Sequence, residues 1–344
     1  MTTSVASAQG GSPRPASGEA LSPELHLRMH TLMLTTRVLE ERLITMYKQG
    51  DGYFWIGGPG EEAFNVPLGL LVDKGMGPDH DYLHLHYRSS GTLLAMGADP
   101  IDSLRQMKNV VTDPYSKGRN FAGHFSVRKW NVVPVTSPIE IQFSIAIGTA
   151  RAQRGAKGIT IVQGGDAGTA EGDFATALVW SSRKGSELPM LMIVTNNRWG
   201  ISTAYEGQHG YPQIADRGKA FSMPSAVVDG NDPEAAYAAL QKAIEYVRTE
   251  RKPYLLEAMV SRLRGHSSAS GANLVKGEVD CLEVFEQKLE ARSLLTRAQM
   301  AQLREKYMDE LGDAAQRVRH EPQPEPGAIY DYVFADKNYV GGEG

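Results

Sequence analysis

Residues 159–172 read ITIVQGGDAGTAEG, and residues 188–200 read LPMLMIVTNNRWG. Each stretch begins with an apolar run, 159–163 in the first and 188–194 in the second. Neither run alternates with polar residues, which is typical of strands covered on both faces of a sheet. Between them, residues 174–184 have helical spacing and are followed by a glycine, a common helix C-cap. This strand–helix–strand order predicts a parallel α/β sheet.

The same alternation continues towards the C-terminus. Two further apolar runs, 226–228 and 254–260, bracket another segment with helical character. Asp232 is its expected N-cap and Pro233 its expected first residue, because Asp accepts hydrogen bonds from free backbone N–H groups and Pro lacks one. The sequence therefore predicts at least four strands joined by helices.

Helical patterns also flank this α/β region. Apolar residues recur with helical spacing over 23–49 and again over 61–72, and a charged, mostly helical region covers about 284–320. Residues 1–22 are rich in Ser, Ala, Gly and Pro, so we expect a disordered tail without a targeting signal. We predict one α/β domain over 23–344, with helical extensions at both ends.

Composition excludes several functional classes. The 344 residues contain 36 Lys and Arg against 40 Asp and Glu, a net charge of −4. This balance gives no basic surface for nucleic acid or an anionic membrane. The single cysteine, Cys281, excludes an internal disulfide framework and a multi-cysteine zinc site. No apolar run approaches the roughly 20 residues that span a bilayer, and we expect a soluble, cytoplasmic protein.

Polar residues follow the two quoted runs directly. Asp166 and Asn197 lie 31 positions apart, about one strand–helix–strand crossover, so they are expected at neighbouring strand ends. A carboxylate, an amide oxygen and a backbone carbonyl suit Mg²⁺, which completes its shell with phosphate oxygens and water. The glycines from 164 to 172 let a phosphate approach the backbone. The alternative is an ordinary glycine-rich turn with Asp166 as a helix N-cap.

The pair Gly165-Asp166 followed by Asn196-Asn197 resembles the thiamine diphosphate motif. The surrounding chain, from about 24 to 335, is similar to the alpha subunit of the decarboxylating component of 2-oxo acid dehydrogenase complexes. That family includes pyruvate, branched-chain 2-oxo acid and acetoin enzymes. The resemblance implies a three-layer thiamine diphosphate-binding α/β fold with a mostly parallel sheet. It also implies decarboxylation of a small 2-oxo acid and transfer of the acyl group to a lipoyl domain.

The resemblance assigns roles to individual residues. A diphosphate needs guanidinium forks, a phenol or imidazole and a metal ion, although each of these side chains alone would be read as a surface or loop residue. His266 is also implied to face the reacting carbon and assist acyl transfer. The implied cofactor-binding residues are Tyr87, Arg88, Ser137, Ile139, Gly165, Ala167, Gly168, Arg262 and His266, with Ser137 and Ile139 meeting the aminopyrimidine ring through their backbone. The implied Mg²⁺ ligands are Asp166, Asn197 and the backbone carbonyl of Trp199.

Some positions depart from the family's pattern. Ala167 replaces a glycine, and 268–273 contain no acidic residue where the family usually has an Asp that orders the loop. That loop is expected to be mobile or held in another way, and phosphorylation of Ser267 or Ser268 stays open. Ser89-Ser90 replace the usual Asp-His, which leaves substrate preference open. A potassium site is doubtful because Ile141 has no side-chain oxygen.

Other candidates carry weaker signals. His80, His84 and His86 lie close together, but alternation over 82–86 predicts a strand rather than a metal site. His124 follows a glycine-rich stretch and is a candidate pocket residue. Phe54 matches a substrate-bordering aromatic of the family but is more typical of a core, and Cys281 is also expected in the core.

The resemblance also implies partners. Activation of thiamine diphosphate requires an acid, which the family places on a separate beta subunit, so we expect an α2β2 heterotetramer that is active only when assembled. A lipoyl-bearing dihydrolipoyl acyltransferase is the expected acyl acceptor. An acetoin or other diketone-cleaving enzyme shares every motif. A non-catalytic cofactor-binding or regulatory subunit also stays open, on the strength of Ala167 and the acid-free loop.

Overall fold

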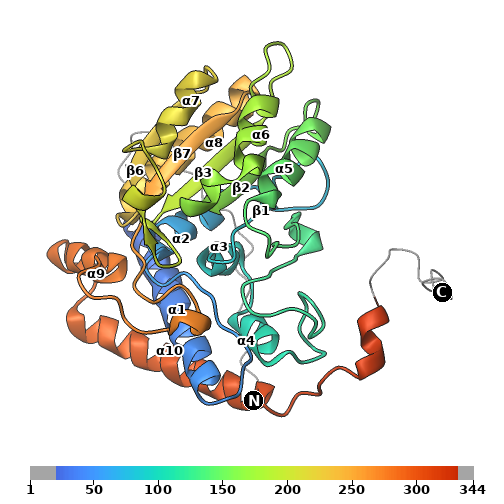
Figure 1. The fold of residues 1–344 in the computed structure, drawn as a ribbon. Helices are drawn as coiled ribbons and strands as arrows, with labels where there is room; N and C mark the ends of the chain where they lie inside the picture. The colour runs from blue at the N-terminus through green and yellow to red at the C-terminus, as the bar shows by residue number, and fades with distance from the viewer. Residues whose placement is uncertain (1–20, 332–344) are drawn as a thin grey trace.

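A five-stranded parallel sheet forms the centre of the computed structural model, which describes residues 21–331 (Figure 1). The strand order is β1-β2-β3-β7-β6, and every neighbouring pair is parallel. This arrangement confirms the predicted parallel α/β sheet. The strands are β1 (Tyr82–His84), β2 (Thr160–Gly165), β3 (Met190–Asn196), β6 (Ser225–Asp229) and β7 (Tyr254–Met259).

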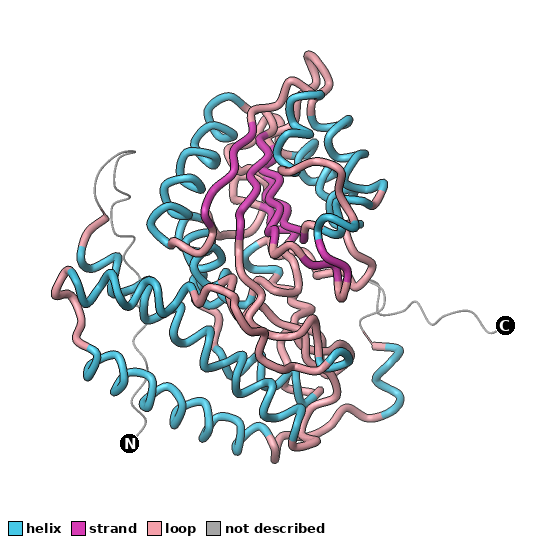
Figure 2. The backbone as a smooth tube through the Cα atoms, turned by 60° about the vertical axis from the view of Figure 1, so that its left-hand side comes forward, coloured by secondary structure: helices cyan, strands magenta, loops and turns pink. Residues whose placement is uncertain are grey.

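The two faces of the sheet belong to two separate hydrophobic cores. Ile161 and Ile193 point into the larger core, whereas Val162 and Met192 point into the smaller one. Successive strand residues face opposite sides, so both faces must be covered. Helices lie on either side of the strands, giving the three layers expected (Figure 2). The smaller core packs against α5 (Ile141–Ala152) and α6 (Gly172–Ser181), and the larger against α2 (Glu62–Leu71), α3 (Ser90–Met96) and α8 (Pro233–Glu250).

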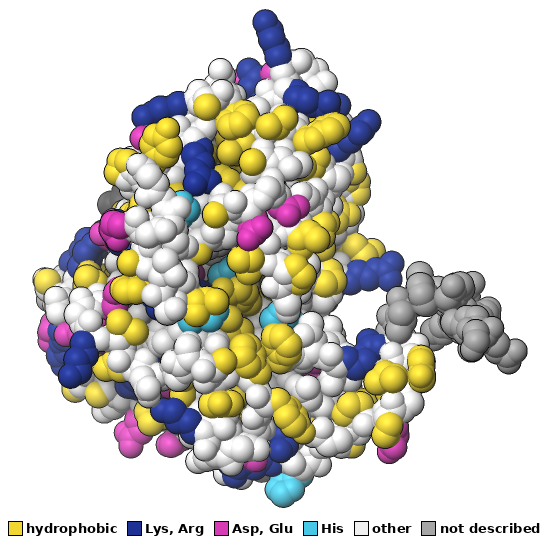
Figure 3. Space-filling view, viewed as in Figure 1, with side chains coloured by type: hydrophobic (Ala, Val, Ile, Leu, Met, Phe, Trp, Pro, Cys, Tyr) yellow, Lys and Arg dark blue, Asp and Glu magenta, His cyan; other side chains and the backbone are white. Residues whose placement is uncertain are grey.

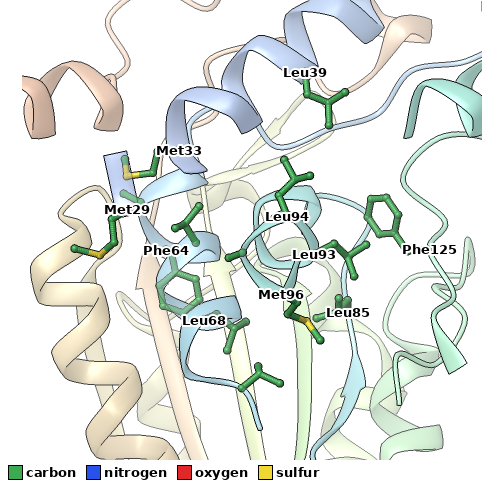
Figure 4. Close-up of a cluster of buried hydrophobic side chains, with 14 of the residues drawn as sticks. Met29, Met33, Leu39, Phe64, Leu68, Leu85, Leu93, Leu94, Met96 and Phe125 are labelled. Atoms are coloured by element: carbon green, nitrogen blue, oxygen red, sulfur yellow. The ribbon is translucent and has the colours of Figure 1, made fainter. Parts of the chain in front are cut away.

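Helices from the two ends of the chain pack together below the sheet. The helix α1 (Pro23–Lys48) contacts α9 (Cys281–Ala291), α10 (Arg297–Val318) and α4 (Pro100–Lys108). Its buried Met29, Met33 and Leu39 join Phe64 and Leu68 of α2 in the larger core (Figure 4). The helical extensions at both ends are therefore confirmed, and they form one continuous core with the sheet.

Local signals fix several helix ends. Ser22 caps α1 by accepting a hydrogen bond from the backbone N–H of Leu25, and Asp232 caps α8 as predicted. Of the tail predicted over 1–22, residues 1–20 lie outside the described residues. The charged C-terminal region divides into two helices, because Ser293 adopts a positive φ of 57° after α9. No helix within 21–331 is both long and apolar enough to cross a membrane.

A buried ionic network fixes three of these helices. Arg37 on α1 is 6% exposed and donates to Glu62 of α2 at 2.6 and 3.0 Å. It also donates to Asp280, the N-cap of α9, at 2.7 and 3.0 Å. The thiol of Cys281 donates to the same Glu62 carboxylate at 3.3 Å. Cys281 is buried in the core, as expected.

We predict that Arg37→Met lowers the free energy of unfolding by about 3–5 kcal/mol, because Glu62 is left buried without its cation. Urea denaturation followed by circular dichroism measures the change. The matched control is Arg304→Met, which removes a partly exposed ion pair between Arg304 of α10 and Glu41 of α1 at 2.8 Å. It is expected to cost about 0–1 kcal/mol. Equal costs for the two variants would contradict a structural role for the buried network.

Candidate functional site

The ends of β2 and β3 bring Asp166 and Asn197 together. Gly165 and Thr195 are paired in the sheet, and the backbone N–H of Asn197 lies near the Asp166 carboxylate and favours its charged form by lowering its pKa. Asp166 is 1% exposed, and its Oδ2 atom has no hydrogen-bond partner among the described residues. Its side chain does not cap the following 3₁₀ helix, η2 (Ala167–Ala170). Asp166 thus stands at the N-cap position that the alternative expected, but its side chain makes no capping hydrogen bond and one carboxylate oxygen is available to a ligand.

Burial is the largest influence on the pKa of the Asp166 carboxyl group. Burial raises the pKa of Asp166 to about 6, although backbone N–H groups and Arg262 favour its charged form. The Asn197 amide oxygen accepts the backbone N–H of Trp199 at 3.1 Å. Trp199 opens a two-stranded hairpin, β4 (Trp199–Gly200) with β5 (Thr203–Ala204). Asn197 and Trp199, two of the three predicted ligands, line a hollow of about 420 Å³, whereas Asp166 is buried beneath the surface.

Arg88 joins the predicted phosphate-binding residues from distant parts of the chain. It is buried, and its Nη1 donates to the carbonyl of Gly57. Its Nη2 donates to the carbonyl and to the Nδ1 atom of His266, at 3.1 and 3.2 Å. Tyr87 stacks edge-on to His266, with ring centroids 6.3 Å apart. Tyr87, Arg88 and His266 are thus in contact with one another.

Arg262 supplies unpartnered donors to the same region. Its Nη2 donates to the carbonyl of Ile201 at 3.1 Å, and its guanidinium lies 5.8 Å from the centre of the Trp199 ring. Its Nε and Nη1 atoms have no partner in the described part of the chain. Burial and the nearby Arg88 lower the pKa of Arg262. Free guanidinium donors beside a free Asp166 oxygen suit an anion that arrives with a metal ion.

His266 is held as a neutral imidazole. Burial, together with the cations Arg88 and Arg262, lowers the pKa of His266 to about 4. At neutral pH its Nδ1 atom accepts the hydrogen bond from Arg88, which assigns the proton to Nε2. His266 therefore presents one fixed N–H donor rather than a second positive charge.

Serines hold the acid-free loop after His266. Ser267 caps the 3₁₀ helix η5 (Ser268–Ser270), and Ser270 completes a capping box with it. The backbone of Ser268 donates to the carbonyl of Trp55 at 2.8 Å, and its hydroxyl accepts the backbone N–H of Trp55 at 3.1 Å. The loop is thus held without an Asp, and the side chains of Ser267 and Ser268 are both buried.

The alanine that replaces a motif glycine is accommodated by another glycine. A Cβ atom added to Gly200 would lie only 2.6 Å from the Cβ of Ala167. The methyl group of Ala167 and the side chain of Gln208 therefore share the space that Gly200 leaves open. Gly165 faces His86, whose ring atoms would lie 3.8 Å from an added Cβ.

The predicted aminopyrimidine segment lies at the start of α5. The Ser137 hydroxyl is 2.8 Å from Nε2 of His124, so the candidate pocket residue His124 contacts this segment. Ile139 is 47% exposed. The next residue, Glu140, reaches the glycine-rich loop that contains Gly168. The segment and the loop are therefore neighbours.

Two weaker candidates have structural roles. His84 lies on β1, as predicted, and its Nε2 is 2.9 Å from the Thr149 hydroxyl. Within 21–331, no group of three or more His, Cys, Asp or Glu side chains is arranged to hold a metal ion. Phe54 packs edge-on against Phe121, with ring centroids 5.0 Å apart.

Sequence reasoning missed two buried carboxyl groups at this site, Glu61 and Glu140. Glu61 is 1% exposed and lies 3.9 Å from Nε of Arg88. Burial raises the pKa of Glu61 to about 7, against the lowering effects of Arg88 and the Asn197 side chain. Their positions in the sequence could have indicated both residues as site candidates. Glu61 directly follows the glycine-rich stretch 57–60, and Glu140 lies inside the predicted aminopyrimidine segment.

Comparisons with known proteins identify the family. The dehydrogenase E1 component model matches residues 30–327. The chain is 29% identical to the 2-oxoisovalerate dehydrogenase subunit alpha of Bacillus subtilis over 317 residues, 89% of this chain and 94% of that protein. It is 26% identical to a pyruvate dehydrogenase E1 component subunit alpha of Rhizobium meliloti over 332 residues, 91% of each chain.

A longer plant relative gives a further match. Identity is 33% to the mitochondrial 2-oxoisovalerate dehydrogenase subunit alpha 1 of Arabidopsis thaliana over 251 residues. These cover 72% of this chain but only 52% of the relative, so the chain spans about half of that protein's length. The matches confirm the resemblance drawn from the motifs. The chain belongs to the dehydrogenase E1 component family, as an alpha subunit of the 2-oxo acid dehydrogenase type.

Proposed function

We propose that this chain binds the diphosphate end of thiamine diphosphate through Mg²⁺, in an enzyme that decarboxylates a small 2-oxo acid and passes the acyl group to a lipoyl domain. The observation that carries the proposal is the unpartnered Asp166 oxygen beside the unpartnered donors of Arg262. Thiamine diphosphate dependence is general to the family. Asp166, Asn197 and the Trp199 carbonyl would hold the metal ion.

The remaining site residues divide between charge compensation and orientation. Arg88 and Arg262 provide the positive charge that a buried diphosphate requires. Tyr87 and the backbone around Gly165, Ala167 and Gly168 would complete the phosphate contacts, and Ser137 and Ile139 would hold the aminopyrimidine ring. When bound, thiamine diphosphate supplies the carbon nucleophile that attacks the 2-oxo group.

His266 is proposed as the catalytic residue of this chain. Its Nε2–H group, fixed by the hydrogen bond from Arg88 to Nδ1, would donate to the acyl oxygen during transfer to the lipoyl group. A neutral imidazole can do this without adding a further buried cation beside Arg88 and Arg262.

The relatives support a branched-chain or pyruvate-type substrate. Those described above are named for 2-oxoisovalerate and for pyruvate. The two departures that favoured a non-catalytic subunit both have compensations, Gly200 for Ala167 and the serine caps for the missing acid. Acetoin-type cleavage stays open, and a substrate panel with the assembled enzyme separates it. The cytoplasmic location stays a prediction.

An exposed apolar surface supports assembly with a beta subunit. Ile141 and Ile145 of α5 are 36% and 42% exposed, and Val179 and Trp180 of the adjacent α6 are 47% and 41% exposed. Figure 3 shows hydrophobic side chains over these two helices. The surface continues to Ile139, beside the proposed aminopyrimidine site. A beta subunit seated here could supply the activating acid, in the proposed α2β2 assembly that delivers acyl groups to a dihydrolipoyl acyltransferase.

We predict that Asn197→Ala weakens binding of thiamine diphosphate in the presence of Mg²⁺ by about tenfold or more, because a metal ligand is lost. Isothermal titration of the co-purified assembly measures this. The control is Asn231→Ala, since Asn231 lines the same hollow and also accepts one backbone N–H, from Ser261 at 3.1 Å. Undiminished affinity in Asn197→Ala would show that the metal assignment is wrong.

We predict that His266→Ala slows lipoyl acylation by about 10²-fold or more, the usual effect of losing a general acid, and that it also weakens cofactor binding. His266→Asn is the matched variant, because an Asn side-chain oxygen can replace Nδ1 as the acceptor for Arg88. Cofactor affinity should recover in His266→Asn while acylation stays slow. Single-turnover acylation of a lipoyl domain provides the rate, and a normal rate in His266→Ala would refute the catalytic role.

We predict that Ile145→Asp abolishes co-purification of the second chain, because a charge is placed in an apolar contact surface. Native mass spectrometry of the purified assembly gives the stoichiometry, expected to be two copies of each chain for the wild type. Met308→Asp on α10, where Met308 is 46% exposed, should leave the assembly intact. An intact assembly in Ile145→Asp would exclude this surface as the beta contact.

A further inference from the structure

The Glu140 side chain lies inside the glycine-rich loop 164–168, against Gly164 and Gly168. It is buried, at 1% exposure. A Cβ atom added to Gly164 would lie 2.2 Å from one carboxylate oxygen of Glu140, and one added to Gly168 would lie 2.0 Å from the other. Both distances are far below any real contact. The Glu140 carboxylate therefore occupies the space that a side chain at position 164 or 168 would need, and it lies directly against the backbone of both glycines.

The carboxylate connects two parts of the proposed site. Glu140 follows Ile139 directly, in the segment assigned to the aminopyrimidine ring. The backbone N–H of Gly165 faces its carboxylate and favours the charged form, while burial raises the pKa of Glu140 to about 8. Its Oε2 atom has no partner among the residues that the structure describes. One side chain thus links this segment to the loop that carries Asp166.

Both the backbone conformation and the burial of Glu140 are energetically unfavourable. Glu140 has a φ of +66°, a left-handed conformation that is unfavourable for a residue with a Cβ. It also buries a carboxyl group near Asp166, Asp173 and Glu171, whose charges disfavour its ionisation. A glycine at position 140 would avoid both the backbone strain and the burial of a carboxyl group. Local strain maintained by the surrounding structure is characteristic of functional sites.

We propose that Glu140 is a positioning residue that locks the loop 164–168 against the segment 136–142, and so holds Asp166 and the loop backbone in their cofactor-binding arrangement. This inference rests on the proposed function. Glu140 acts through the loop and need not touch the cofactor. The alternative is that the Glu140 carboxylate occupies the position that the diphosphate must take. Removing the carboxylate would then strengthen cofactor binding and not weaken it.

Two variants separate the carboxylate from the backbone strain. Glu140→Gly removes the carboxylate and accepts the positive φ, so loss of function in this variant does not come from strain. Glu140→Gln keeps the shape, the φ and an oxygen that can accept the Gly165 N–H. We expect Glu140→Gly to weaken Mg²⁺–thiamine diphosphate binding by about tenfold or more, and Glu140→Gln to restore most of it. Calorimetric titration of the full-length chain, in the assembly in which it purifies, gives both values.

Hydrogen exchange of the cofactor-free protein provides a second readout. Amides of 164–170 should exchange at least about tenfold faster in Glu140→Gly than in the wild type, while those of the core strand β3 stay unchanged. Wild-type affinity in Glu140→Gly would overturn the proposal, and tighter binding would show that Glu140 competes with the diphosphate. If the wild type does not bind the cofactor, the proposed function fails. The hydrogen-exchange rates would then still show whether Glu140 holds the loop 164–168 in place.

Discussion

The burial of opposite charges at one edge of the sheet is the constraint on which the site depends. Arg88 and Arg262 lie there with Glu61, Glu140 and Asp166, and all five are at most 9% exposed. Polar groups withdrawn from water need partners, yet oxygens of all three carboxyl groups and two nitrogens of Arg262 have no hydrogen-bond partner within 21–331. A metal ion with a diphosphate would satisfy acceptors and donors together.

The fold supplies this edge through parallel strands. Because β2 and β3 run in the same direction, their carboxyl ends lie side by side and deliver Asp166 and Asn197 to one place. The rest of the site comes from loops that the helices hold. Arg37, Glu62 and Asp280 fix α1, α2 and α9 to one another, and α2 begins directly after Glu61. Helix packing far from the chemistry therefore helps to set where Glu61 lies.

The departures from the family's motifs are compensated locally. Ala167 fits because Gly200 faces it, and serine hydroxyls replace a carboxylate in ordering the loop after His266. Glu140 differs from these, since it adds a buried carboxyl group and a left-handed backbone conformation and does not replace a lost contact. A new contact that replaces a lost one preserves the site. A residue that adds an unfavourable conformation and a buried carboxyl group, as Glu140 does, indicates a functional role for that residue.

The sequence by itself determined the strand order along the chain, the Asp232 cap of α8 and the residues that end β2 and β3, because apolar runs and N-capping residues act over short distances. It placed the end of α6 at the glycine after 184, whereas the helix ends at Ser181. It also indicated Tyr87, Arg88 and His266, which the structure brings into contact. Only the tertiary structure decided that Arg262 keeps free donors, that Gly200 admits Ala167 and that Glu140 fills the glycine loop. Those facts depend on contacts between segments distant in sequence, and no local pattern encodes such contacts.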